Sequence, residues 1–322
     1  MSQDESGASR REFFGAAAGI AAIVATAAVP SEAAAAAAPP VPSSQGDKLR
    51  ALLKGADPLP APIVYDVASA KLAQFMGFKV ITIGGSATSS GMYGMGDYGM
   101  ATISELVELA VRMAQALETP LIADADDGGG NPMNVYRAMK RYARGGVACV
   151  LLEDLTGAKH VPGRPEGQMV PLAVHVDKIK AARDAGGATG PLVLARTDGL
   201  GKGENFDQIL ERVKAYADAG AELIFVSGAS LEQKKKVAQT TGRPLFSTGG
   251  PASVTEEAAN GVKVPAFAIE PYALGASHAA MTALLKDGKI SGLPTVPREA
   301  SLAIADAKMW AEIHQKYNAD KA

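Results

Sequence analysis

The sequence predicts a (β/α)8 barrel, in which eight parallel strands form a closed ring surrounded by helices. From residue 47 onward, short runs rich in β-branched residues alternate with longer stretches of helical periodicity. Eight such units fill about 250 residues, which is the usual size of one barrel. A doubly wound open sheet is the competing fold. It favours a phosphate-binding glycine fingerprint after the first strand, whereas residues 66–70 read DVASA.

The predicted strands, in chain order, are residues 62–65, 79–83, 120–123, 148–152, 192–195, 222–226, 244–247 and 266–269. Helical patterns lie between them, and the clearest cover residues 104–117, 133–144 and 206–219. Two further helices, 272–285 and 298–317, follow the eighth strand. The last one carries more apolar side chains than a lone terminal helix should expose, which predicts that a partner subunit covers it.

Residues 1–38 read as a twin-arginine export signal. Arg10 and Arg11 precede an apolar, alanine-rich run over 15–29, and small residues suited to cleavage follow. The apolar run is shorter than the roughly 20 residues that span a bilayer. We therefore expect export to the periplasm or outside the cell, without stable membrane insertion after processing; a disordered tail or a single anchor is the alternative. Residues 39–58 are predicted to be a linker and lead-in, and residues 59–322 the barrel with its C-terminal helices.

Composition excludes several classes of protein. The chain has 32 basic and 34 acidic side chains, which argues against a generally basic nucleic-acid binder. Its single cysteine, Cys149, excludes an intramolecular disulfide framework and any multi-cysteine zinc or iron–sulfur site. Because Cys149 lies within an apolar predicted strand, we expect it to be a buried core thiol. A small molecule is the partner class that remains.

Charged residues follow several predicted strands, at the end where barrel enzymes carry their active sites. The residues that follow the third, fourth and fifth strands are Asp124, Asp126, Asp127, Glu153, Asp154, Arg196 and Asp198. Neighbouring carboxylates repel one another unless a cation neutralises them, and oxygen ligands without thiols favour Mg2+ or Mn2+ over zinc. The Arg196 guanidinium would suit an anionic substrate. Asp127 and Asp198 could equally cap the helices that follow them.

Several of these segments resemble the isocitrate lyase/phosphoenolpyruvate mutase superfamily. Residues 122–131, IADADDGGGN, are similar to its D-A-D-x-G-x-G-N signature. Further matches are 65–71 (YDVASAK), 145–148 (GGVA), 153–154 (ED), 195–198 (ARTD) and 217–221 (ADAGA). The resemblance extends from about residue 60 to residue 286. It implies a Mg2+-dependent barrel that forms a homo-oligomer, usually a tetramer whose subunits exchange a C-terminal helix.

The resemblance also implies roles for individual residues. Asp124 should contact Mg2+ directly, and Asp97, Asp126 and Glu153 should hold the water molecules of the metal. The substrate-binding set that we assign is Tyr65, Gly84, Gly85, Arg196, Ser227 and Ser247. Within it, Gly84 and Gly85 occupy the place where backbone amides grip a substrate carboxylate. The chemistry that the superfamily shares is formation of an enolate from a Mg2+-chelated 2-oxo acid, with the metal absorbing the developing charge.

The loop after the fourth strand departs from the family pattern. Lyases of this family carry a catalytic cysteine there, in K-K/R-C-G-H, whereas residues 158–163 read AKHVPG and place Val161 at the cysteine position. Lys159 keeps a family lysine and is predicted to contact a substrate carboxylate. His160 is the loop group whose ordinary pKa suits proton transfer near neutral pH, although it could simply be a solvated loop histidine. The predicted catalytic residues are therefore Arg196, Lys159 and His160.

Other departures concern the substrate. Ser227 and Ser247 stand where lyases of this family carry larger or acidic groups, which predicts a different, larger or less polar distal group. The leading hypothesis is a Mg2+-dependent lyase that cleaves a C–C bond in, or decarboxylates, a 2-oxo or 2-hydroxy carboxylic acid. One alternative is C–P chemistry on phosphonopyruvate-like substrates, against which the A-R-T-D at 195–198 argues, since mutases carry A-R-V-E. The other is a non-catalytic periplasmic barrel that binds carboxylates.

Overall fold

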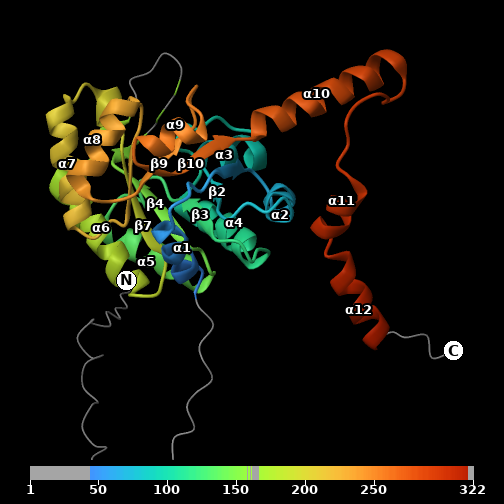
Figure 1. Ribbon diagram of the computed structural model, residues 1–322, viewed down its shortest axis with the longest axis horizontal. Helices are drawn as coiled ribbons and strands as arrows, with labels where there is room; N and C mark the ends of the chain where they lie inside the picture. The colour runs from blue at the N-terminus through green and yellow to red at the C-terminus, as the bar shows by residue number, and fades with distance from the viewer. Residues whose placement is uncertain (1–43, 158, 160, 162–166, 318–322) are drawn as a thin grey trace, which may run out of the picture. The chain divides into compact units, whose positions relative to one another are not determined.

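The computed structural model describes residues 44–157, 159, 161 and 167–317. The predicted export signal, residues 39–43 of the predicted linker, and His160 lie outside this part of the chain. Within it, eight parallel strands close into a barrel in the order β1-β10-β9-β8-β7-β4-β3-β2 (Figure 1). The predicted (β/α)8 barrel is therefore confirmed. None of the described helices is both long enough and apolar enough to cross a membrane.

The barrel strands overlap all eight predicted ones. They are β1 (Ala61–Val64), β2 (Ile81–Ile83), β3 (Leu121–Asp124), β4 (Cys149–Glu153), β7 (Leu192–Thr197), β8 (Leu223–Val226), β9 (Leu245–Thr248) and β10 (Val262–Ala268). β10 begins four residues before its predicted start and contains Pro265, a residue that normally argues against a strand. Its pairing with β9 is irregular between Val262 and Val264. A short antiparallel ribbon, β5 (Leu155–Thr156) with β6 (Gln168–Met169), follows β4.

Helices surround the barrel. They are α2 (Val67–Phe75), α3 (Gly85–Tyr93), α4 (Ile103–Gln115), α5 (Pro132–Arg144), α6 (Leu172–Gly186), α7 (Phe206–Asp218), α8 (Leu231–Thr241) and α9 (Val254–Ala259), with a 3-10 turn, η1, at Gly199–Lys202. α2, α4, α7, α8 and α9 each begin with a reciprocal capping box. In α4, Leu106, Leu109 and Met113 are buried on one face, so helical periodicity marks the surface that packs on the strands.

A helix that the sequence analysis missed, α1, covers Gln45–Lys54 in the segment predicted to be a linker and lead-in. The Ser44 side chain caps it by accepting a hydrogen bond from the Asp47 amide at 3.0 Å. Leu49 is fully buried in one cluster with Val80 and Leu192, at the starts of two barrel segments. This segment is therefore part of the barrel's core.

Three further helices follow the barrel: α10 (Glu270–Asp287), α11 (Arg298–Ile304) and α12 (Ala307–Tyr317). The predicted helix 298–317 is divided in two at Asp306, which adopts a left-handed φ of 50°. α11 packs against α2, and Lys71 of α2 forms an ion pair with Asp306. α10 and α12 bury no residue, and Leu285 is 91% exposed. That a partner subunit covers these helices remains a prediction.

Candidate active site

Three adjacent strands bring the predicted charged residues together at the carboxyl end of the barrel. Asp124 ends β3, Glu153 ends β4, and Arg196 lies near the end of β7. β4 pairs in parallel with both of its neighbours, with Asp124 opposite Leu151 and Glu153 opposite Arg196. Because parallel strands end at the same edge of a barrel, this register places the predicted side chains on one face.

Backbone amides fix the Asp124 carboxylate. Its Oδ1 accepts a hydrogen bond from the Asp126 amide at 3.0 Å, and its Oδ2 accepts one from the Gly85 amide at 2.8 Å. Gly85 is the first residue of α3 and Gly84 is its N-cap, so the positive end of this helix faces Asp124. The resemblance implies that the Gly85 amide binds a substrate carboxylate. In the structure this N–H is already donated to the protein's own carboxylate.

The Asp126 carboxylate lies beside that of Asp124, near Gly85. Asp126 has a φ of 46°, a left-handed conformation that aspartate adopts more readily than most residues. Burial, reinforced by the charge of Asp124 and opposed by Lys159, raises the pKa of Asp126 to about 6. The clustering of carboxylates thus disfavours their ionised forms unless a cation is close by.

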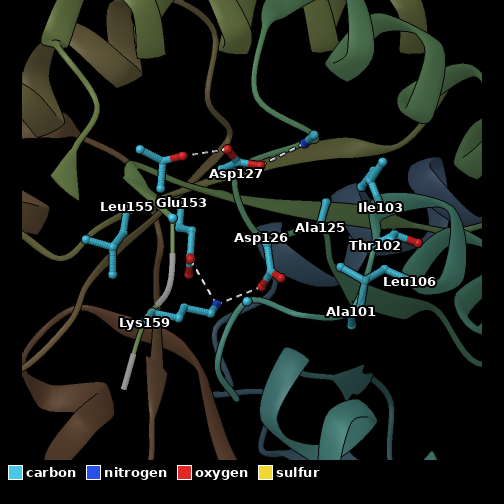
Figure 2. A pocket seen from close by; sticks show the side chains of 14 residues that line it. Ala101, Thr102, Ile103, Leu106, Ala125, Asp126, Asp127, Glu153, Leu155 and Lys159 are labelled. Carbon is cyan, nitrogen blue, oxygen red and sulfur yellow. Dashed lines mark hydrogen bonds and ion pairs between the residues drawn. The ribbon is translucent and has the colours of Figure 1, made fainter. Parts of the chain in front are cut away.

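Lys159 supplies a cation in this structure. Its Nζ lies 2.7 Å from Asp126 Oδ1, 2.9 Å from Glu153 Oε1 and 3.5 Å from Asp97 Oδ1. Figure 2 shows the ammonium between Asp126 and Glu153. Burial alone would lower the pKa of Lys159, but Glu153 and Asp126 outweigh it and raise that pKa above its usual range. Lys159, predicted to meet a substrate carboxylate, therefore binds the predicted metal-site carboxylates here.

Arg196 is held by carboxylates on two sides. Its Nε and Nη2 each donate to one oxygen of Asp198 at 2.8 Å, and its Nη1 lies 3.2 Å from Glu153 Oε2. The guanidinium also stacks over the Phe225 ring, 5.3 Å from its centroid. Burial raises the pKa of Glu153, and Arg196 and Lys159 oppose that rise. The bidentate face of Arg196 is thus occupied by Asp198, and Nη1 is the edge directed toward the carboxylate cluster.

A buried polar network behind Arg196 escaped the sequence analysis. The Asp154 carboxylate accepts a hydrogen bond from Tyr216 Oη at 2.6 Å and another from the Asp198 amide at 3.0 Å. Arg212 lies 3.7 Å from the same carboxylate. Asp154 was noted as a strand-end residue, whereas Tyr216 matched only an apolar helical pattern. No local signal could have paired them, because 62 residues separate them in the chain.

The two aspartates whose roles were left open differ in function. Asp127 Oδ1 accepts hydrogen bonds from the amides of Gly129 and Gly130, so it shapes the loop after β3. Helix α5 is capped instead by Asn131, whose Oδ1 accepts from the Asn134 amide at 3.0 Å. Asp198 precedes η1 but makes no side-chain cap there, since its carboxylate holds Arg196. Neither aspartate therefore caps the helix that follows it.

The remaining predicted substrate residues lie at the same end of the barrel. Ser227 directly follows β8 and is half-buried. Ser247 in β9 is 1% exposed, and its hydroxyl has no hydrogen-bond partner within the described residues. Tyr65 directly follows β1 and is half-buried. Burial, reinforced by Asp66 and Glu270, raises the pKa of Tyr65. The structure thus brings all the predicted site residues that it describes to one end of the barrel.

A cavity adjoins the cluster. It has a volume of about 330 Å3 and lies against Asp126, Glu153 and Lys159, and apolar side chains from α4 and β5 form part of its wall (Figure 2).

Cys149 is fully buried in the barrel interior, and burial raises the pKa of its thiol well above the usual value. The expectation of a core thiol is borne out, so Cys149 does not replace the cysteine missing at Val161.

The carboxylates fit a small, hard cation. A Cβ atom placed on Gly85 would lie 3.0 Å from Asp126 Oδ1, 3.2 Å from Asp124 Oδ2 and 3.6 Å from Asp97 Oδ1. Three carboxylates thus border one space that the absence of a side chain at Gly85 keeps open. In the described part of the chain, no three Asp, Glu, His or Cys side chains are arranged to ligate a metal directly.

Known proteins share this sequence and fold. Residues 49–287 match the family model described as phosphoenolpyruvate phosphomutase. Isocitrate lyase of Haloferax volcanii is 36% identical over 189 residues, 58% of this chain and 54% of the lyase, so the chain spans about half the length of that relative. Oxaloacetate decarboxylase of Rhodopseudomonas palustris is 34% identical over 209 residues, 65% of this chain and 72% of the decarboxylase.

Solved structures show the same architecture. Oxaloacetate acetylhydrolase, in complex with the inhibitor 3,3-difluorooxalacetate, matches this chain with a TM-score of 0.78 and 27% sequence identity. The match covers 86% of this chain and 98% of the hydrolase. The barrel therefore has counterparts among proteins whose names include small carboxylic acids.

Proposed function

This chain belongs to the phosphoenolpyruvate phosphomutase family, within the isocitrate lyase/phosphoenolpyruvate mutase superfamily, and we propose that it is a Mg2+-dependent lyase. The proposed substrate is a 2-oxo or 2-hydroxy carboxylic acid, in which the enzyme breaks a C–C bond or removes a carboxylate. The observation that carries the proposal is the convergence of Asp97, Asp124 and Asp126 on the space above Gly85, with Arg196 beside the cluster.

The residues have separate tasks in this proposal. Asp124, held by two backbone amides, would bind Mg2+, and Asp97, Asp126 and Glu153 would hold its water molecules; Mn2+ is the alternative ion. A Mg2+ ion held there would supply charge stabilisation for the enolate of a 2-oxo acid. Arg196 directs Nη1 toward the same region, where it can bind an anionic group of the substrate. Asp198 holds that guanidinium in place.

The departures from the lyase pattern guide the choice of substrate. Val161 cannot transfer a proton, so we propose His160, in the same loop, as the acid–base group. Ser227 and Ser247 are small neutral residues at the ends of β8 and β9. We therefore expect the distal group of the substrate to be larger or less polar than in the lyases that carry larger or acidic side chains there. Loss of CO2 from a 2-oxo acid requires no base to remove a proton from a substrate hydroxyl, so the absence of the loop cysteine is compatible with a decarboxylase.

The test is turnover by the processed protein with Mg2+. The substrate panel contains oxaloacetate, 2-methylisocitrate, 2,3-dimethylmalate and phosphonopyruvate, and release of pyruvate or another 2-oxo acid is followed. Asp124→Asn should abolish turnover, while Asp207→Asn, which changes an aspartate in the first turn of α7, should leave it unchanged. Release of phosphate from phosphonopyruvate alone would favour C–P chemistry instead. Binding of these acids without turnover would favour a non-catalytic barrel.

We also propose a homo-oligomer, with a tetramer that exchanges C-terminal helices as the expected form. The exposed apolar side chains of α10 and α12, among them Leu285 and Trp310, support it. Light scattering coupled to size-exclusion chromatography tests the assembly, and Leu285→Glu should dissociate it. A monomeric wild-type protein would refute this proposal.

Export by the twin-arginine route is a separate proposal, supported by the residue pattern at 9–14. Replacing both Arg10 and Arg11 by lysine should retain the protein inside a host with that pathway. Unchanged export of the double variant would refute the route.

A further inference from the structure

Lys159 has an unusual position for a lysine of a substrate-binding loop. Its side chain is 3% exposed, and its ammonium contacts three carboxylates that come from different segments: Asp97, Asp126 and Glu153. Two of these contacts, at 2.7 Å and 2.9 Å, are charge-assisted hydrogen bonds. An ammonium is a compact point charge with three donors, so it can satisfy three acceptors at once.

The same oxygen atoms face the proposed metal position. Asp126 Oδ1 lies 2.7 Å from Lys159 Nζ and 3.0 Å from the position that a Cβ atom would take on Gly85. Asp97 Oδ1 lies 3.5 Å from Nζ and 3.6 Å from that point. An oxygen that accepts a hydrogen bond from the ammonium has one acceptor site fewer for a water molecule of a metal ion. The ammonium and a hydrated divalent cation therefore require the same acceptors.

The charges around the cluster also indicate that the Lys159 ammonium and a divalent metal ion compete for it. Lys159 forms ion pairs with Asp97, Asp126 and Glu153 of the cluster, and Arg196 forms ion pairs with Glu153 and Asp198. The charge of Asp124 acts on both cations. Among the described residues, Lys159 is the cation that forms ion pairs with Asp97 and Asp126, whereas Arg196 reaches only Glu153 of this cluster. With a divalent cation in place, the ammonium would add an adjacent like charge. Repulsion would then favour its departure.

We propose that Lys159 is a built-in counter-cation of the carboxylate cluster, and that a divalent metal ion displaces it. This inference rests on the proposed function, because it assumes that the cluster binds such an ion. The displaced ammonium has space nearby, since Lys159 lines the cavity of about 330 Å3 whose wall also includes Asp127 and Thr156. The displacement would couple metal binding to the release of a cation able to meet an anionic substrate.

Chemical labelling of the wild-type full chain tests the displacement directly. The protein is treated with an amine-acylating reagent, with and without saturating Mg2+, and acylation is measured by peptide mass spectrometry. Labelling of Lys159 should increase several-fold when Mg2+ is added. Lys178 provides a matched internal control: it is also a buried lysine, but its Nζ donates to the Asp127 carbonyl at 2.8 Å. Equal labelling of Lys159 in both conditions would overturn the proposal.

Metal affinity gives a second measurement. Lys159→Met should bind Mg2+ roughly tenfold more tightly than the wild type by titration calorimetry, because the ion no longer displaces charge-assisted hydrogen bonds. Lys178→Met should bind within about twofold of the wild type, since this lysine does not contact the oxygens in question. If the wild type binds Mg2+ and Lys159→Met binds it equally or more weakly, the counter-cation role is wrong. If neither protein binds Mg2+ or Mn2+, the proposed metal dependence fails, and this inference fails with it.

Discussion

His175 should make the folded protein sensitive to mild acid. Its ring is fully buried in α6, and neither ring nitrogen has a hydrogen-bond partner within the described residues. The ring packs against Tyr216 with centroids 4.7 Å apart. Burial, with smaller contributions from Lys178 and Arg212, lowers the pKa of His175 to about 3. The folded state therefore holds this histidine in its neutral form.

The sign and the size of the effect follow from proton linkage. In the unfolded chain the His175 pKa should be near 6.5, so between about pH 6.5 and 3 the unfolded state binds a proton that the folded state does not. The free energy of unfolding must then fall as the pH falls through this range. At pH 5 the loss that this one residue causes is about 2 kcal/mol relative to neutral pH. It grows by about 1.4 kcal/mol for each further pH unit.

Urea denaturation at pH 7.5 and 5.0 measures this effect. His175→Met removes the titrating group and puts an apolar side chain of similar size in its place. Other groups titrate in both proteins, so their contributions cancel when the pH-dependent losses are compared. The wild type should lose about 2 kcal/mol more than His175→Met between the two pH values. His278→Met, which changes an exposed histidine of α10, should show the wild-type loss. Equal losses in the wild type and His175→Met would refute the reasoning.

Three further substitutions test particular contacts. Tyr216→Phe should lower the free energy of unfolding by about 1–3 kcal/mol, because it removes a donor from the buried Asp154 carboxylate; a change below about 0.5 kcal/mol in urea denaturation would contradict this. Leu49→Ala should lower the free energy of unfolding by about 3 kcal/mol in urea denaturation, because Leu49 of α1 is fully buried. A loss no larger than that of Leu53→Ala, which changes a half-buried residue of α1, would indicate that α1 can detach from the barrel. Asp198→Asn should raise the KM for an anionic substrate, since Arg196 loses a charged partner at 2.8 Å, and an unchanged KM would exclude this positioning role.

The barrel was predictable because its signals are local and repeated. The β-branched runs and the helical periodicity occur eight times, so an error at one unit does not change the fold. The predicted strand at 266–269 was placed too late, since Pro265 argues against a strand in isolation. Helix α1 was missed even though Ser44 and Leu49 supply a cap and an apolar position, because a proline-rich stretch directly precedes it.

The sequence predicts which residues form the candidate site, but it does not predict which of them form ion pairs and hydrogen bonds with one another. The positions of Asp124, Asp126 and Glu153 after apolar strands predict a cluster from the sequence alone. That Lys159 lies among these carboxylates, and that Asp198 occupies the bidentate face of Arg196, could not be read from the residues. The sequence suggested a substrate contact for both cations, whereas the structure shows internal partners for each.

The sequence by itself determined the fold class, the end of the barrel that carries the charged residues and the absence of a loop cysteine at Val161. These properties depend on periodicity and on residue type, which act over a few neighbouring positions. The tertiary structure decided which charges neutralise one another. Asp154 meets Tyr216, and Asp126 meets Lys159, across many residues of intervening chain. Such contacts arise when barrel closure removes charged groups from water, because a buried charge must then find whatever partner the fold places within reach.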